Sequence, residues 1–244
     1  MINIITINWN NKSGLQKTIS SLREQSLQRS KWRFIVIDGL STDGSVGLLE
    51  ENKDFINISL IENDDGVYDA MNKGIDRVPH GEYFLFLNSG DIFASSDVLL
   101  NLNNDLMSSD DVDIIYGDKI DENGMLQKAY FPESMKYGII NACHQCILYK
   151  KNNIKYDLQY KLFSDLDFTL NYYKHGAKFK YCNRPISVYE GGGLSTIHSW
   201  NTKKEIYYIV LRRFGMINFV KFLLVKAGTL IGLKHTLYLK KHSS

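Results

Sequence analysis

The stretch from Tyr83 to Asp91 reads YFLFLNSGD, five apolar residues followed at once by a polar turn that ends in a carboxylate. A continuous apolar run is typical of a strand covered on both faces, as in a parallel sheet. In open α/β sheets the ligand crevice lies beyond the carboxyl ends of such strands. Asp91 is therefore expected where a phosphate or metal ion would bind, although it could also serve only to accept hydrogen bonds from its own turn.

The segment before this stretch alternates between apolar runs and stretches with helical spacing. Strands are predicted at residues 2–8, 34–37, 56–61 and 83–87, with helices between them. This β-α-β alternation predicts an α/β fold whose sheet is mixed but mostly parallel and is flanked by helices. Neither G-x-G-x-x-G nor G-x-x-x-x-G-K-[ST] occurs, which argues against a Rossmann dinucleotide site and a P-loop.

Charge is divided unevenly along the 244 residues, whose net charge is +2. From Lys203 to the end there are nine basic residues and one acidic residue, whereas the preceding part holds 20 basic and 26 acidic residues. Such asymmetry suggests that the basic segment meets an anionic partner. The hydrophobic content of 44% with only three prolines indicates a folded globular chain.

Three cysteines cannot form a disulfide framework, so a reducing cytoplasm is the expected compartment. The N-terminus lacks a basic n-region and a cleavage site, and is predicted to be a strand and not a signal peptide. Cys143 and Cys146 have C-x-x-C spacing, but no second ligand pair stands at a metal-like distance. Ordinary buried thiols are therefore favoured over a zinc or redox site.

Four short motifs in the first part of the chain together resemble one known family. They are TINWN at 6–10, VIDGLSTDGS at 36–45, DGVYDAMNKG at 65–74 and FLNSGD at 86–91. In this order and spacing they resemble the family 2 glycosyltransferases of GT-A fold, and among these the bacterial enzymes of O-antigen and colanic-acid-type polysaccharide synthesis. A fifth motif, near residue 165, extends the resemblance to about residue 200. The resemblance implies an inverting hexosyltransferase that uses a nucleotide sugar, with UDP favoured.

The resemblance also implies where the donor binds. Asp38 would bind the nucleobase or ribose, and the backbone near Thr6 and Asn8 would form a wall beside the base. The family usually has a second aspartate directly after the first, where this chain has Gly39.

The family's metal motif, usually D-x-D, corresponds here to the turn Asn88, Ser89, Gly90 and Asp91, in which only Asp91 keeps a carboxylate. By the resemblance this turn borders the donor diphosphate. One carboxylate together with the donor's phosphate oxygens can hold Mn²⁺ or Mg²⁺, because Mg²⁺-like ions keep several waters and bind substrate phosphates.

Asp69, Asn72 and Lys73 are expected on one side of the helix that follows Gly66, since residues three and four apart are neighbours on a helix. The resemblance implies that they border the donor sugar. A local ion pair on a solvated face explains the same spacing equally well.

Two carboxylates, Asp165 and Asp167, open the helix predicted between Ser164 and Gly176, and Ser164 is expected to cap it. Acidic residues in a first turn also interact favourably with the helix dipole. The resemblance implies that an acid here is the catalytic base of inverting enzymes. The register favours Asp165, with Asp167 in reserve.

Two further stretches carry polar residues that could reach a substrate. His144 and Gln145 precede an apolar strand and could contact the acceptor or the diphosphate, although a lone histidine is more often structural. Three consecutive glycines in the stretch 189–200 indicate a flexible loop, which could close over the donor and bring His198 to the metal.

The C-terminal apolar residues are interrupted by Arg212, Arg213, Lys221, Lys226 and Lys234, so no run approaches the roughly 20 residues of a membrane-spanning helix. Basic amphipathic helices are typical of segments that lie on an anionic membrane surface. Packing on the sheet or on another subunit is the alternative.

The domain organisation expected is a GT-A domain over 1–200, with a donor half at 1–95 and an acceptor half at 96–200, followed by a basic helical segment at 201–244. The expected partners are a UDP-sugar, a lipid-diphosphate-linked saccharide acceptor and the inner face of the cell membrane. A homodimer is left open, and no nucleic acid is expected. A nucleotidyltransferase and a non-catalytic carbohydrate-binding or membrane scaffold protein remain alternatives.

Overall fold

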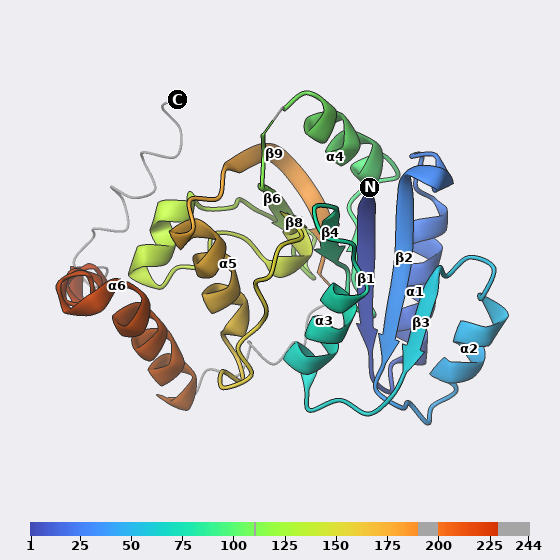
Figure 1. Cartoon of the computed structure of the whole chain (residues 1–244), viewed down its shortest axis with the longest axis horizontal. Helices are drawn as coiled ribbons and strands as arrows, with labels where there is room; N and C mark the ends of the chain where they lie inside the picture. The colour runs from blue at the N-terminus through green and yellow to red at the C-terminus, as the bar shows by residue number, and fades with distance from the viewer. Residues whose placement is uncertain (110, 190–199, 229–244) are drawn as a thin grey trace.

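The computed structural model describes residues 1–109, 111–189 and 200–228, and a mixed nine-stranded sheet forms its centre (Figure 1). The strands are β1 (Ile2–Asn8), β2 (Trp32–Asp38), β3 (Ile58–Ile61), β4 (Tyr83–Phe86), β5 (Ile92–Phe93), β6 (Ile114–Ile120), β7 (Leu126–Gln127), β8 (Ile147–Lys150) and β9 (Phe179–Val188). Their order is β3-β2-β1-β4-β8-β6-β9-β5, with β7 paired to β6.

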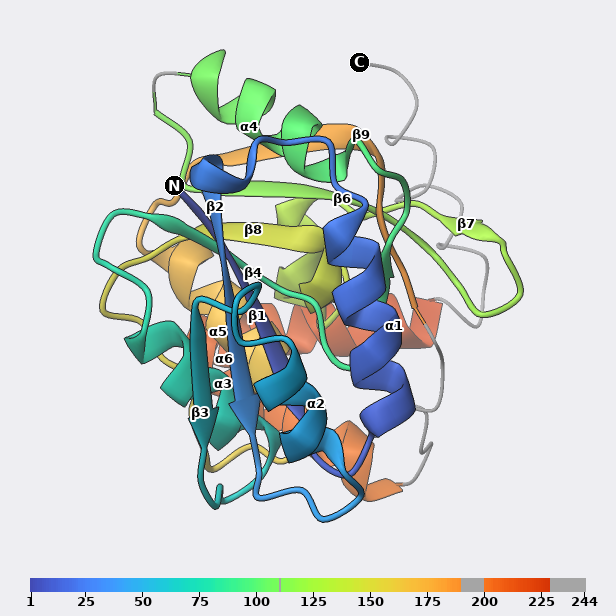
Figure 2. The ribbon, with the colours of Figure 1, turned by 90° about the vertical axis from the view of Figure 1, so that its right-hand side faces the viewer.

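Helices cover both faces of this sheet. They are α1 (Lys12–Arg23), α2 (Ser45–Glu51), α3 (Val67–Asp76), α4 (Val98–Met107), α5 (Ser164–Lys174) and α6 (Trp200–Gly228), with short 3₁₀ turns η1 (Arg29–Lys31), η2 (Pro132–Tyr137) and η3 (His144–Cys146). Figure 2 shows α1 and α2 on one side of β1 and β2, with α3 on the other.

The first four strands are parallel, because β1 pairs in parallel with β2 and β4, and β2 pairs in parallel with β3. The second half of the sheet is mixed, since β8 runs antiparallel to both β4 and β6 while β9 is parallel to β6. The predicted α/β fold with a mixed sheet is confirmed. Parallel pairing brings the carboxyl ends of β1, β2 and β4 to one edge of the sheet.

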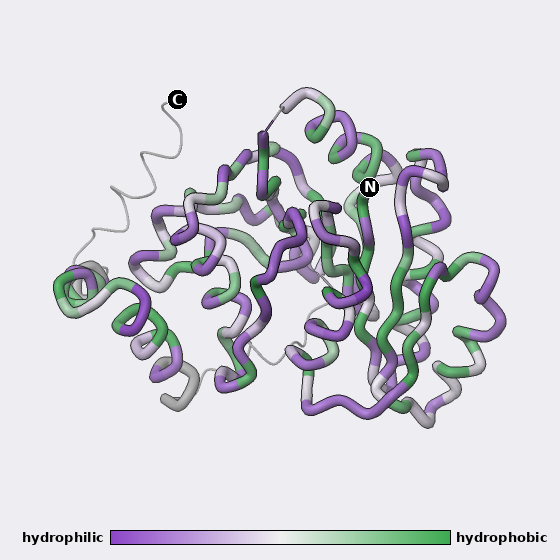
Figure 3. The backbone as a smooth tube through the Cα atoms, in the orientation of Figure 1, coloured by the Kyte–Doolittle hydropathy of each residue, from purple (hydrophilic) through white to green (hydrophobic). Residues whose placement is uncertain are grey.

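Successive strand residues point to opposite faces, so a strand that is covered on both faces contributes to two hydrophobic clusters. Ile4 of β1 belongs to the cluster under α1, α2 and α4, whereas the next residue, Ile5, belongs to the cluster under α3 and α5. Figure 3 shows β1 and β2 as mainly hydrophobic along their length. Burial on both faces explains why the strands read as continuous apolar runs.

An aromatic cluster attaches α5 to the sheet. The ring of Phe168 stacks on that of Tyr156 at 4.2 Å and meets that of Tyr149 edge-on at 5.2 Å. Tyr149 in turn stacks on Phe84 of β4 at 5.4 Å. Aromatic contacts of this kind add about 0.5–1.5 kcal/mol each beyond buried area, so α5 is held firmly over the second half of the sheet.

Helix α6 is interrupted at Gly215, whose φ of 74° lies outside the helical region. In the part before Gly215, Ile209 is fully buried in a cluster with Met135, Leu166 and Leu170. At the end of η2, a Cβ added to Gly138 would lie 2.6 Å from the side chain of Ile206. The first part of α6 therefore packs tightly on α5 and η2.

The part of α6 after Gly215 exposes apolar side chains. They are Met216 (64% exposed), Ile217 (76%), Val220 (47%), Leu223 (41%) and Leu224 (64%). This exposed apolar face of α6 is unlike the buried first part. Within the described ranges, no helix combines the length and the hydropathy needed to cross a bilayer.

Candidate functional site

A cleft of about 660 Å³ lies between the two halves of the sheet. Its lining includes Asn88, Ser89 and Asp91 from the turn after β4, and Asp165 from the first turn of α5. The fold therefore brings together the two carboxylates, Asp91 and Asp165, that the sequence separates widely. His144 and Gln145 line the same cleft.

The carboxylate of Asp91 is held in a fixed orientation. It is only 4% exposed, and its Oδ2 accepts a hydrogen bond from Nε2 of Gln145 at 2.8 Å. The thiol of Cys143 donates to Oε1 of the same glutamine, which directs the amide nitrogen toward Asp91. Gly90 has a φ of 104°, a conformation that favours glycine and lets the chain turn sharply before Asp91.

Two buried oxygen atoms belong to the same turn as Asp91. Oδ1 of Asn88 and Oγ of Ser89 are inaccessible to solvent, and neither has a hydrogen-bond partner among the described residues. Buried polar atoms are normally paired, because an unpaired one costs about 1–3 kcal/mol. These two oxygens therefore favour a ligand that is bound at this turn.

Asn88, His144 and Asp165 form a polar chain across the cleft. Nδ2 of Asn88 donates to Nε2 of His144 at 3.0 Å, and Nδ1 of His144 lies 3.8 Å from Oδ2 of Asp165. Each ring nitrogen of His144 therefore faces one of these two side chains. Asp165 thus lies beside this histidine at the wall of the cleft.

Tyr68 is a cleft residue that the sequence reasoning missed. Its hydroxyl donates to the carbonyl of Leu162 at 2.8 Å. Burial, and after it the charge of Asp165, raises the pKa of Tyr68 well above its ordinary value, so the hydroxyl stays protonated. Its only signal in the sequence was its position inside the DGVYDA motif.

Several lysines and tyrosines that the sequence reasoning missed also line the cleft. Lys119, Lys128 and Lys161 lie there with Tyr130 and Tyr189. The ammonium group of Lys119 lies 5.0 Å from the ring centroid of Tyr189. These residues come from separate segments, so no sequence motif unites them, yet the three lysines add positive charge to the lining of the cleft.

The residues predicted to hold the nucleotide lie at the ends of β1 and β2 and do not line the cleft. Asp38 is 0% exposed, and its carboxylate accepts from the backbone of Ser41 at 2.7 Å and from Nδ2 of Asn8 at 2.7 Å. The hydroxyl of Thr6 donates to the carbonyl of Leu87 at 2.6 Å. These side chains hold the strand ends together.

The predicted residues of α3 are also paired with protein groups. Lys73 lies 3.2 Å from Asp69 and 3.1 Å from Glu62, so the local ion pair that the spacing indicated is present. The amide of Asn72 exchanges two hydrogen bonds of 2.9 Å with the backbone of Tyr156. Asn72 thereby attaches the backbone at Tyr156, in the segment that leads to α5, to helix α3.

Two expectations about the first turn of α5 differ from the structure. Asp167, the reserve candidate for the base, is 0% exposed and is paired with Arg213, away from the cleft. Ser164 as helix cap is wrong, because Phe163 is the N-cap residue and the Ser164 hydroxyl donates to the carbonyl of Asp157. His198 and the glycine loop lie outside the described residues.

The C-x-x-C pair has the properties of buried thiols. Burial raises the pKa of Cys143 to about 11 and raises that of Cys146 further, so both thiols stay protonated at neutral pH. Metal binding by cysteine needs the thiolate. In the ranges that the structure describes, no group of three or more His, Cys, Asp or Glu residues could hold a metal ion.

Known proteins resemble this chain in sequence and in fold. A relative from Mycobacterium bovis (strain BCG / Pasteur 1173P2), a PGL/p-HBAD biosynthesis glycosyltransferase, is 28% identical over 206 residues, covering 80% of this chain and 79% of the relative. The structure of S. aureus TarS 1–349 in complex with UDP-GlcNAc has a TM-score of 0.70 at 15% identity and covers 87% of this chain, which spans 66% of that chain.

A second solved structure is the mannosyltransferase PcManGT from Pyrobaculum calidifontis in complex with GDP-Man and Mn²⁺. It has a TM-score of 0.67 at 14% identity, covering 97% of this chain and 71% of that chain. Both structures have the GT-A fold expected from the sequence. Residues 3–158 match the family model described as Glycosyl transferase family 2. The chain therefore belongs to glycosyl transferase family 2 and is a glycosyltransferase.

Proposed function

We propose that this glycosyltransferase moves a hexose from a UDP-sugar to a hydroxyl of a lipid-diphosphate-linked saccharide, with inversion at the anomeric carbon, in bacterial surface polysaccharide synthesis. The observation that carries the proposal is that Asp91 and Asp165 line one cleft. One carboxylate would lie at the donor diphosphate and the other at the acceptor hydroxyl.

The donor would lie along the carboxyl ends of β1, β2 and β4, where α/β sheets bind nucleotides. TarS and PcManGT, which share the fold, are described in complex with UDP-GlcNAc and GDP-Man. In this proposal Asp38 and Asn8 shape the turn against which the base lies. Asp69, Asn72 and Lys73 would shape the segments that border the sugar.

The turn after β4 fits a hard divalent cation. Mn²⁺ and Mg²⁺ prefer oxygen ligands, and the unpaired buried oxygens of Asn88 and Ser89 belong to the same turn as Asp91. Asp91 and Asn88 would hold the ion together with the donor's phosphate oxygens. When bound, the ion would neutralise the charge that develops on the departing diphosphate.

The chemistry assigned to the protein itself is proton transfer. The acceptor oxygen attacks the anomeric carbon from the face opposite the diphosphate, its proton passes to Asp165, and the bond to the diphosphate breaks. His144, whose Nδ1 lies 3.8 Å from Oδ2 of Asp165, would help to orient the carboxylate. One displacement turns an α-linked donor into a β-glycoside.

The test of this function is a panel of UDP- and GDP-sugars, assayed with lipid-diphosphate-linked saccharides. We expect a UDP-sugar to yield a glycoside and free UDP. Release of pyrophosphate would instead indicate a nucleotidyltransferase, and binding without any product would indicate a non-catalytic carbohydrate-binding protein.

Chelation is expected to abolish most of this activity. A metal ion contributes several kcal/mol to transition-state stabilisation, so EDTA should lower kcat by about 100-fold or more. Mn²⁺ or Mg²⁺ added in excess should restore it. Full activity in EDTA, measured after extensive dialysis, would contradict a role for the ion.

The exposed apolar face of α6, with the basic residues of the C-terminal segment, is proposed to contact the anionic inner leaflet. Burial of an isoleucine or leucine contributes about 1.5–3 kcal/mol. The double variant Ile217→Asp, Leu224→Asp should therefore bind vesicles of phosphatidylglycerol at least about 100-fold more weakly than wild type. Vesicles of phosphatidylcholine are the control, and equal binding by the variant would reject the contact.

A further inference from the structure

The three residues that precede α5 donate their backbone N–H groups to a single carboxylate from α6. Glu205 accepts from Lys161 at 3.0 Å through Oε1, and from Leu162 at 3.0 Å and Phe163 at 3.1 Å through Oε2. Charge-assisted hydrogen bonds of this kind are roughly twice as strong as neutral ones. This contact therefore fixes the backbone of 161–163 in place.

The segment 161–163 is part of the cleft and leads directly into Asp165. All three of its residues line the cleft with Asp165. Phe163, the N-cap residue of α5, makes no side-chain capping bond of its own. Glu205, from a distant helix, therefore binds the N-cap residue of α5 and the two residues before it.

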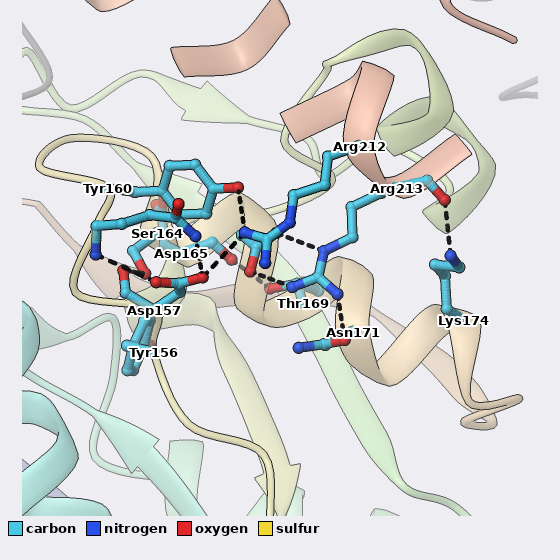
Figure 4. Close-up of polar contacts among 12 residues, drawn as sticks. Tyr156, Asp157, Tyr160, Ser164, Asp165, Thr169, Asn171, Lys174, Arg212 and Arg213 are labelled. Carbon is cyan, nitrogen blue, oxygen red and sulfur yellow. Dashed lines mark hydrogen bonds and ion pairs between the residues drawn. The ribbon is translucent and has the colours of Figure 1, made fainter. Parts of the chain in front are cut away.

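Helix α6 also holds the chain on the other side of Asp165. Arg213 donates from Nε and Nη2 to the two oxygens of Asp167, both at 2.6 Å, and from Nη1 to Asn171 at 2.9 Å. Figure 4 shows Arg213 reaching across to α5 while Arg212 meets Tyr160. Asp165 therefore lies between two points that α6 anchors.

We propose that Glu205 is a positioning residue of the active site, which sets the position of Asp165 through the backbone of 161–163. The inference rests on the proposed role of Asp165 as the base. A carboxylate that must meet an acceptor hydroxyl loses much of its effect when it is displaced, and a displacement of about 1 Å can cost about 100-fold in rate. Glu205 binds the backbone of 161–163, so it would affect kcat by setting the position of Asp165 and not by touching the substrate.

The variant Glu205→Ala is expected to lower kcat by about 10- to 100-fold and to leave the KM for the nucleotide sugar within about twofold. Glu205→Gln keeps one acceptor oxygen and should recover part of kcat. The matched control is Lys204→Gln, which removes an exposed charge from the neighbouring position of the same helix and should have wild-type kcat.

Amide hydrogen exchange gives a second readout that does not depend on activity. In Glu205→Ala we expect faster exchange at 161–163 and in the first turn of α5, with unchanged protection in β1, β2 and β4. Wild-type kcat in this variant, or unchanged exchange at 161–163, would overturn the inference. If Glu205→Ala loses protection against exchange in the whole protein, the variant is globally destabilised. In that case kcat and the exchange at 161–163 in Glu205→Gln test the inference.

The two proposals fail in different ways. If the wild-type protein transfers no sugar across the panel, the proposed function fails whatever Glu205 does. If wild type transfers sugar and Glu205→Ala does so equally fast, only the positioning role fails.

Discussion

Asp165→Asn is expected to lower kcat by about 10²- to 10⁴-fold, the usual contribution of a positioned general base. Asparagine matches aspartate in size, and its Oδ1 can still accept the 2.8 Å bond from the backbone of Leu166, so the helix turn should persist. Affinity for UDP should change by less than about twofold, because Asp165 lies across the cleft from the donor turn. Steady-state kinetics and calorimetric titration with UDP measure the two effects.

The control is Glu51→Gln, which neutralises an exposed carboxylate at the end of α2, remote from the cleft. This variant should keep wild-type kcat. A folded Asp165→Asn protein that turns over as fast as wild type would exclude Asp165 as the base.

Arg213→Met is expected to lower the free energy of unfolding by about 3–5 kcal/mol. The carboxylate of Asp167 is fully buried, and the side chain of Arg213 is only 19% exposed. Removing the guanidinium leaves a buried charge without compensation, which is the costly way to break such a pair. For a chain of this size the melting temperature should fall by roughly 10 °C. Denaturant unfolding measures the free energy directly.

The double variant Arg213→Met, Asp167→Leu separates pairing from packing. Replacing both members of a buried ion pair by apolar residues is often close to neutral, so this variant should recover most of the lost stability. A double variant as unstable as Arg213→Met would show that packing at the α5–α6 contact, and not the unpaired charge, is responsible.

The parallel half of the sheet could be predicted because its signals are local. The apolar runs of β1, β2 and β4 are covered on both faces, and the predicted helices fill the crossovers between them. The order of the strands in the second half of the sheet could not be predicted from local patterns. Strand β8 lies between β4 and β6, and β9 lies between β6 and β5, partners that are set by long-range packing and not by local pattern.

In the candidate site, too, some residues carry a local signal in the sequence and others do not. Asp91 was singled out by its place at a strand end, and Asp165 by its place at a helix start together with the resemblance to the family. Glu205 carries no such pattern, since its three partners lie more than forty positions earlier in the chain. Ser164 had the pattern of a cap, but Asp157 accepts its hydroxyl and the capping expectation was wrong.

By itself, the amino-acid order of this chain determined which segments become strands and helices, the family to which it belongs, and which carboxylates stand at element ends. Only the tertiary structure decided that Asp91 and Asp165 share a cleft, that Asp38 is turned into the protein, and that Glu205 holds the segment before α5. The physical reason is that hydrophobic periodicity acts over a few residues, whereas a hydrogen bond between distant residues forms only after the sheet and helices have packed.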